Sequence, residues 1–262
     1  VNRGPWGLYV GTTHFDETGW RVQSPSQITQ AVADLAFRSG RTDAGITVTY
    51  ADTNLNGNGP APVELLAFDR SAVFTFPDIT NNRLAFVQGR YNLVVNSTWS
   101  IQASAYARKL DRQTFNGDEA EFGACDDDAL PAGAPADTLC HGVNDDDDDD
   151  DSGLNDEDMA DDDDASEDAH PLADLITGRF ITTRDAAGDG AFNRTDTATE
   201  GYGATLQATA RGTLGQREHI LMFGASVDVA DVLFGMNSEI GTMTPTRTVT
   251  GSGLFAGVYG KG

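Results

Sequence analysis

Apolar and polar side chains alternate along several windows of this chain with a period of two residues. In the window 43–52, Ala44, Ile46, Val48 and Tyr50 alternate with polar or smaller residues. Because successive side chains of a β-strand point to opposite faces of a sheet, this pattern predicts strands with one apolar and one polar face. The windows with this pattern are 31–37, 43–52, 85–95, 99–108, 202–210 and 221–229. We interpret 6–15 as a further strand and 253–259 as the start of another.

Short and long connections alternate between these windows. Residues 39–42, 96–98 and 212–216 suit tight turns, whereas 16–28, 53–80, 113–197 and 236–248 are long. Bacterial outer-membrane barrels are connected in this way, with the short turns on the periplasmic side. A soluble β-sandwich shows no such rule, and a loop as long as 113–197 would be exceptional in a compact soluble domain. We therefore predict an all-β fold, an antiparallel transmembrane β-barrel segment of about eight strands with short periplasmic turns and long extracellular loops.

The two predicted faces differ in charge. The apolar set has no Lys or Arg in mid-strand, as a surface in contact with lipid requires. Tyr91 and Trp99 flank the turn at 96–98 and suit an interfacial aromatic girdle, although they could equally be ordinary packing residues. The charged residues of the polar face are Asp34, Arg90, Arg108 and Asp228.

The net charge of −24 arises mainly from one segment. Residues 145–168 contain 16 Asp and Glu residues and no Lys or Arg, so the rest of the chain carries −8. Nucleic acid is excluded as a partner, because its phosphates would be repelled. No stretch approaches the roughly 20 consecutive apolar residues of a membrane-spanning helix. Barrel strands would not be detected by that test, since their alternation averages to near-neutral hydropathy.

The acidic run 145–168 is the candidate metal site of the sequence. Carboxylate oxygens are the ligands that Ca²⁺ prefers, and Asp148, Asp150 and Asp156 fit the start of an EF-hand frame. The frame fails at its twelfth position, where Met159 replaces the bidentate Glu. We favour the alternative of a self-repelling, low-complexity loop. A third interpretation is electrostatic attraction of cationic substrates.

Cys125 and Cys140 flank a polar segment, and we predict a disulfide between them, formed in an oxidising compartment. The four histidines show no metal-ligand spacing, and neither a nucleophile elbow nor a phosphate-binding loop is present. We therefore expect no enzymatic activity and no cofactor apart from the possible Ca²⁺.

Six segments resemble the barrel portion of TonB-dependent outer-membrane receptors. They are 7–21 (GLYVGTTHFDETGWR), 53–59 (TNLNGNG), 69–82 (DRSAVFTFPDITNN), 113–118 (QTFNGD), 192–207 (FNRTDTATEGYGATLQ) and 238–249 (SEIGTMTPTRTV). The resemblance implies that residues 1–262 are part of a receptor barrel, with 113–197 as a long extracellular loop. It also implies uptake of a scarce small-molecule ligand across the outer membrane of a Gram-negative bacterium, with energy from a TonB-type complex. Ferric chelates (siderophore uptake) are the commonest ligand class of that family.

The chain departs from that family in showing no plug domain and only about eight strands. We therefore expect a fragment of a longer chain or one partner of a split receptor. Ligand recognition would lie in the long loops, as it commonly does. The candidate ligand-binding residues there are Trp20, Arg21, Asn54, Asn56 and Asn58. Two alternatives remain open: a small self-contained outer-membrane barrel with a structural or adhesion role, and a soluble calcium-binding β-domain.

Overall fold

The computed structural model describes residues 1–57, 59–120, 122–127, 129–141, 170–185 and 190–256. The chain divides into two compact units. Unit 1 comprises residues 1–115 and 194–236 with the last four residues, and unit 2 comprises residues 116–193 and 237–258. The acidic run 145–168, with the predicted calcium ligands Asp148, Asp150 and Asp156, lies outside the described residues, as does Asn58.

Antiparallel strands form nearly all of the described secondary structure. A nine-stranded sheet has the order β1-β2-β3-β4-β5-β6-β10-β11-β12, so chain neighbours are also sheet neighbours except where β10 follows β6. Each of the eight predicted windows overlaps a strand of this sheet in the described residues, which confirms the all-β, antiparallel prediction. The strands are β1 (Asn2–Arg3), β2 (Trp6–Glu17), β3 (Ser26–Ser39), β4 (Thr42–Asn56), β5 (Asp78–Val94), β6 (Trp99–Glu119), β10 (Gly190–Leu214), β11 (Arg217–Met243) and β12 (Val249–Ala256).

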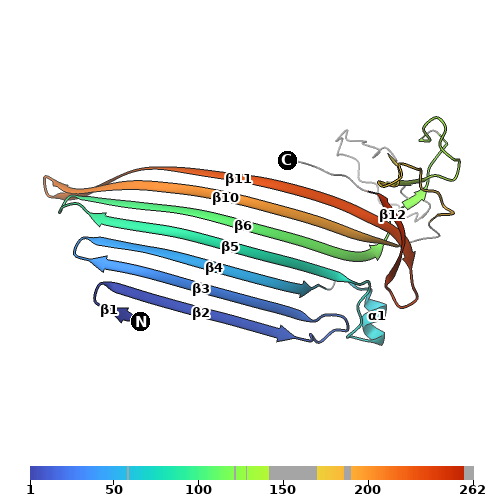
Figure 1. The fold of residues 1–262 in the computed structure, drawn as a ribbon, viewed down its shortest axis with the longest axis horizontal. Helices are drawn as coiled ribbons and strands as arrows, with labels where there is room; N and C mark the ends of the chain where they lie inside the picture. Colours follow the sequence, from blue (N-terminus) through green and yellow to red (C-terminus); the bar gives the residue numbers. More distant parts are fainter. Residues whose placement is uncertain (58, 121, 128, 142–169, 186–189, 257–262) are drawn as a thin grey trace, which may run out of the picture. The chain divides into compact units, whose positions relative to one another are not determined.

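The predicted short turns join β3 to β4, β5 to β6 and β10 to β11, and they lie together at one end of the sheet (Figure 1). Gly40 and Gly215 have φ values of 54° and 67°, a left-handed conformation that glycine adopts without steric cost. At the turn between β5 and β6, Asn96 accepts hydrogen bonds through its side-chain oxygen from the backbone N–H groups of Thr98 and Trp99. These local features set the register of the hairpins.

The strands continue further into the long connections than the alternation predicted. β6 extends to Glu119 and β10 begins at Gly190, so the predicted loop 113–197 is wrong by several residues at both ends. In the extended parts, polar side chains bond across the strands, as Asn54 does to Asn81 (2.6 Å) and Gln113 to Asp196 (2.8 Å). Polar side chains lie on both faces of the sheet in these extended parts, so the alternation of apolar and polar residues disappears. The backbone hydrogen bonds between the strands nevertheless continue.

The all-β prediction omitted one helix. A six-residue helix, α1 (Val63–Phe68), interrupts the connection between β4 and β5. The helix is too short for its apolar residues to show a helical period. The pattern of apolar and polar residues therefore did not reveal this helix. Within the described part of the chain, no helix has the length and apolar character needed to cross a membrane.

Unit 2 contains a second, three-stranded sheet built from β7 (Phe122–Ala124), β8 (Leu139–His141) and β9 (His170–Pro171). Its core is a small cluster of buried apolar side chains. The cluster consists of Leu139, Ile181, Ile240 and Ala256, with Phe122, Leu172 and Leu254 packed against it. The sequence pattern did not predict this core, because its members come from separate strands and irregular segments that lie far apart in the chain and share no period.

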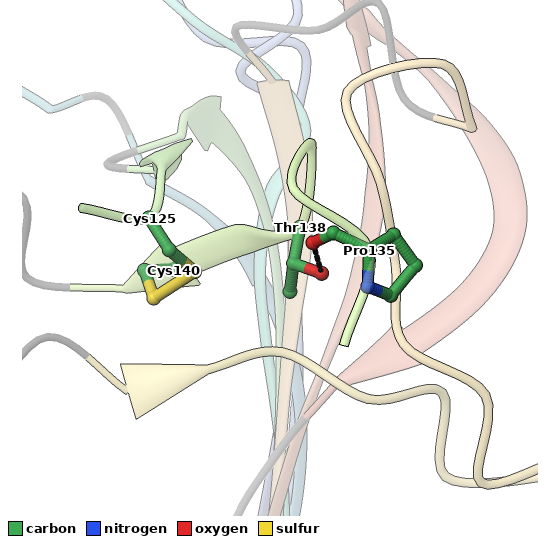
Figure 2. The surroundings of a disulfide bond; sticks show 4 residues. All are labelled: Cys125, Pro135, Thr138 and Cys140. Carbon is green, nitrogen blue, oxygen red and sulfur yellow. Dashed lines mark hydrogen bonds between the residues drawn. A yellow bond between two sulfur atoms is a disulfide. The ribbon is translucent and has the colours of Figure 1, made fainter. Parts of the chain in front are cut away.

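The predicted disulfide joins Cys125 and Cys140, and both residues are buried (Figure 2). Beside it, the Thr138 hydroxyl donates a hydrogen bond of 2.7 Å to the Pro135 carbonyl, and Cys125 N–H donates to the carbonyl of Thr138. The disulfide therefore joins Cys125, just after β7, to strand β8. This arrangement confirms the pairing predicted from the sequence.

Candidate functional site

The strand register of unit 1 aligns apolar side chains in straight rows across β2, β3, β4 and β5. We call these rows the apolar band. Counted from the short-turn end, they are Trp6, Phe37, Ala44 and Tyr91; Leu8, Leu35, Ile46 and Gly89; Val10, Ala33, Val48 and Val87; and Thr12, Ala31, Tyr50 and Ala85. The alternating residues of the same strands point to the opposite face.

The apolar band is exposed. Ile46 retains 53% of its accessible surface and Val48 retains 49%. Leu206 on β10 and Phe223 on β11 belong to the same alternating set and are 58% and 60% exposed. A contiguous apolar surface of this kind marks a site for a partner or for a membrane.

Charged and polar side chains end the band on the side of the long connections. The next row is His14, Thr29, Asp52 and Arg83, in which Arg83 pairs with Asp52 at 3.3 Å. On β6 and β10, the pair Lys109–Glu200 (2.8 Å) occupies the corresponding alternating positions. Exposed ion pairs contribute little to stability. The position of these ion pairs is more informative than their energy. They mark the border of the apolar surface at a similar level on several strands.

Aromatic side chains end the band on the side of the short turns. Trp6 and Phe37 pack with ring centroids 4.8 Å apart, and Tyr91 lies in the same row. Tyr91 and Trp99, predicted to form a girdle, are both 40% exposed. Trp and Tyr are enriched where hydrocarbon meets water, because their rings are apolar and carry a polar group.

A shallow hollow of about 890 Å³ lies on this apolar side of the sheet. Its lining combines the alanines Ala103, Ala105, Ala204 and Ala225 with larger side chains such as Leu206. A twisted sheet is saddle-shaped, so a row of small residues between larger ones leaves a depression. Ligand pockets normally include a few convergent polar groups. This hollow is lined mainly by alkyl groups and suits hydrocarbon chains.

The polar face contains a network of charged side chains at mid-sheet. Arg90 donates two hydrogen bonds to Asp34, of 2.6 and 3.0 Å, and a third of 3.1 Å to the hydroxyl of Thr47. Thr47 donates in turn to Asp34. A side chain at Gly45 would meet the guanidinium, since a Cβ built there lies 2.5 Å from its Cζ. Gly45 therefore provides the space for this bidentate pair.

The predicted ligand-binding residues lie in two different environments. Trp20 is 72% exposed in the connection between β2 and β3, and the Arg21 guanidinium lies 5.0 Å from its ring centroid. Asn54 and Asn56 were expected in a loop, but both belong to strand β4. Asn56 donates to the Pro25 carbonyl, and Asn54 bonds to Asn81. The Asn54 amide therefore connects neighbouring strands, and the Asn56 amide connects β4 to the segment before β3. Of the predicted ligand-binding residues that the structure describes, only Trp20 and Arg21 lie in a connection between strands.

The connections after β2 and after β4 are joined at one point, where Val22 N–H donates to the Ser71 carbonyl at 2.9 Å. In the second connection, Asp69 accepts hydrogen bonds from the Ser71 hydroxyl and backbone N–H, which lower the pKa of its carboxyl group. Among the described residues, no group of three or more His, Cys, Asp or Glu side chains is arranged to hold a metal ion.

In unit 2, the buried carboxylate of Asp174 and the half-buried carboxylate of Asp185 hold the irregular segments. Asp174 is 2% exposed and accepts from the Thr177 hydroxyl (2.6 Å) and from Phe255 N–H (3.0 Å), and these bonds lower its pKa. Asp185 accepts two hydrogen bonds from Arg179 and one from Thr182 N–H, and its pKa falls to about 2. These groups stabilise the unit, and their partners within the protein account for their shifts.

One group of residues was missed by the sequence analysis. Arg38, Arg41 and Arg211 line a depression of about 300 Å³ at the short-turn end of the sheet. They lie in or beside the predicted turns 39–42 and 212–216. The sequence shows that arginines are concentrated at two short turns. That these arginines converge on one depression follows only from the strand order β3-β4-β5-β6-β10.

No protein-family model matches the chain, and the search of curated proteins gives no match. Among solved structures, the chain is similar to the crystal structure of the ferric-catecholate import receptor Fiu from E. coli K12 in its open form. The TM-score is 0.40 at 8% sequence identity, over 94% of this chain and 49% of that one. The chain thus spans about half the length of that receptor. Because the likeness is slight, we base the functional proposal on the two faces of the sheet.

Proposed function

We propose that unit 1 is a membrane-spanning segment of an outer-membrane β-barrel, with the apolar band against lipid and the polar face toward an aqueous lumen. The observation that carries this proposal is the apolar band itself. It is exposed, contains no charged residue, and is bordered by aromatic rings on one side and by the charged residues Asp52, Arg83, Lys109 and Glu200 on the other. Lipid-facing surfaces of barrels have this composition.

The height of the band agrees with a bilayer. The strand rises roughly 27 Å from Ala44 to Asp52 at about 3.4 Å per residue, and roughly 34 Å from Trp99 to Lys109. A tilt of about 45° reduces these lengths to roughly 19–24 Å along the membrane normal. The apolar band of known outer-membrane barrels is about 25 Å tall. A surface made for a protein partner has no reason to match this height on successive strands.

An open sheet cannot remain in lipid, because its edge N–H and C=O groups would be unpaired. In the described residues the sheet order ends at β1 and β12, and β1 pairs only with Trp6 and Gly7 of β2. We propose that further strands complete the barrel, supplied by a longer chain or by a second subunit.

Within the outer membrane of a Gram-negative bacterium, we propose a role in ligand import driven by a TonB-type complex, without bond chemistry in this chain. The six sequence segments that resemble TonB-dependent receptors support this role. Ferric chelates are the first ligand class to test, with Trp20 and Arg21 as candidate contacts in the loop. We propose no resident cofactor; Ca²⁺ at Asp148, Asp150 and Asp156 is the one metal worth testing.

Tryptophan fluorescence tests the membrane proposal, because the chain has three tryptophans in different predicted positions. Variants that keep only Trp6, only Trp99 or only Trp20, with Phe at the other two positions, would be refolded into vesicles containing brominated phosphatidylcholine. We expect strong quenching of Trp6 and Trp99 by bromines near the headgroup, and little quenching of Trp20. A protein that stays monodisperse without detergent and shows no quenching at Trp6 or Trp99 would refute the proposal.

Transport is tested separately in the host. Deletion of the gene should abolish energised uptake of a radiolabelled ferric catecholate, and a protonophore should abolish the same uptake in the parent cells. Unchanged uptake of this and other ferric chelates after deletion would exclude the iron proposal while leaving the membrane proposal intact.

A further inference from the structure

Arginine side chains gather on the polar face of unit 1 at its short-turn end. Arg38, Arg41 and Arg211 line the depression of about 300 Å³ described above, which we call the turn-end basic pocket. Its lining comes from the turn between β3 and β4 and from the adjoining ends of β5, β6 and β10. The remaining polar side chains of the lining are Thr42, Asp43, Asn92, Ser100 and Gln102.

The charges of this pocket are not balanced. Arg38 pairs with Asp43, the only carboxylate among the described lining residues, through its Nε at 2.6 Å. Arg41 donates one hydrogen bond of 2.8 Å to the Val95 carbonyl, which uses one of the five donors of a guanidinium. Three arginines against one aspartate leave two positive charges in excess. By contrast, the mid-sheet pair Asp34–Arg90 is neutral.

Hydrogen bonds hold the pocket residues in place. Arg211 N–H donates to the Thr98 carbonyl at 2.8 Å, and Val94 N–H donates to the Arg41 carbonyl at 2.9 Å. Both arginines therefore extend from backbone that is fixed against the neighbouring hairpin. Guanidinium groups bind carboxylates well, because their planar N–H groups match the two carboxylate oxygens.

We propose that the turn-end basic pocket binds the carboxylate side chains of an acidic peptide segment. The amides of Asn92 and Gln102 and the hydroxyl of Ser100 supply donors and acceptors for the backbone of such a segment. Under the proposed function a lipid phosphate is disfavoured, because Arg38, Asn92 and Gln102 occupy the alternating positions opposite the apolar band. The location of the pocket at the periplasmic mouth of a barrel rests on the proposed function; the binding of carboxylates does not.

A fluorescein-labelled hexaglutamate peptide provides the probe. The full 262-residue chain would be refolded in detergent micelles, and fluorescence anisotropy would be followed at roughly 0.15 M salt, where charges separated by more than about 8 Å are screened from one another. We expect hexaglutamate to bind at least tenfold more tightly than hexaglutamine. The R41Q/R211Q variant should lose at least tenfold in affinity. The R41K/R211K variant should lose less than R41Q/R211Q but bind more weakly than the wild type, because it keeps both charges without the bidentate geometry of the guanidinium.

The matched control is R70Q/R112Q, which removes the same charge from two exposed arginines outside the pocket. Its affinity for hexaglutamate should stay within twofold of the wild type. Equal binding of hexaglutamate and hexaglutamine, or equal losses in R41Q/R211Q and R70Q/R112Q, would overturn the proposal. Insertion of the same proteins into vesicles tests the membrane proposal independently. Peptide binding without insertion would support the proposal for the turn-end basic pocket and contradict the proposal of a membrane-spanning barrel.

Discussion

The hydroxyl of Tyr106 donates a hydrogen bond of 2.7 Å to the carboxylate of Asp228, although the two residues lie 122 positions apart in the chain. Tyr106 is on β6 and Asp228 is on β11, so their bond passes over the intervening strand β10. At the point of crossing, β10 carries Gly203, and a Cβ built there would lie 2.6 Å from Tyr106 Cε1. The glycine thus makes room for a polar bridge between next-nearest strands.

Replacement of Gly203 by Ala should therefore destabilise the sheet. The added methyl group would displace Tyr106 and break its bond to Asp228, and overpacking of this kind costs about 1–3 kcal/mol. The free energy of unfolding, measured by urea titration of the protein folded in vesicles, checks this expectation.

The control for that substitution is Gly89→Ala in β5. No heavy atom lies within 4 Å of a Cβ built at Gly89, so the methyl group meets open space. Because alanine restricts the unfolded chain, this variant should be neutral or more stable by roughly 0.5–1 kcal/mol. If both variants lost the same stability, the close approach at Gly203 would not be the cause.

Adjacent residues of β10 should respond oppositely to a new charge. Leu206 belongs to the apolar set and Thr205 to the polar set, and both are exposed. Leu206→Arg should weaken folding into vesicles by about 2–4 kcal/mol, the cost of Arg near the bilayer midplane. Thr205→Arg, which faces water under the proposed function, should cost less than about 1 kcal/mol. Similar costs for the two variants would contradict a lipid-facing band.

The disulfide should stabilise unit 2 without affecting membrane insertion. Cys125 and Cys140 are separated by 15 residues, and a loop of that size is stabilised by roughly 3 kcal/mol when closed. We expect unit 2 of the C125A/C140A variant to unfold at a lower urea concentration. Unfolding of unit 2 would be followed by tryptophan fluorescence, with a Phe180→Trp substitution in a protein that has no other tryptophan. Flotation with vesicles should remain as in the wild type. A loss of flotation would show that unit 2 is required for the sheet to fold.

Acid should weaken unit 2 through Asp185. Hydrogen bonds from Arg179, and then from Thr182 N–H, lower the pKa of this carboxyl from 3.8 to about 2. Because the folded pKa lies below the unfolded value, the stabilisation is complete above about pH 4 and is lost as the pH falls toward 2. The difference in unfolding free energy between wild type and Asp185→Asn should shrink over that interval, measured with the same Phe180→Trp substitution as the fluorescent reporter. A difference independent of pH would rule out this ionised contact.

Much of unit 1 was predictable because its information is local. An alternating window such as 43–52 specifies a strand and its two faces without reference to any other segment, and Gly40 with its neighbours specifies a turn. The bond between Cys125 and Cys140 was predictable for a similar reason, since both lie in one polar segment. The small core around Ile181 and Ile240 was not, because its residues are far apart and follow no period.

The sequence by itself determined the class of secondary structure, the hairpin order and the apolar and polar faces of the strands, because a period of two maps directly onto the two sides of a sheet. Only the tertiary structure decided the register, and with it which side chains meet. A shift of one residue between β4 and β5 would separate Asp52 from Arg83 and end the charged border of the apolar band. Pairing across strands depends on hydrogen bonds between distant segments, which no local pattern contains.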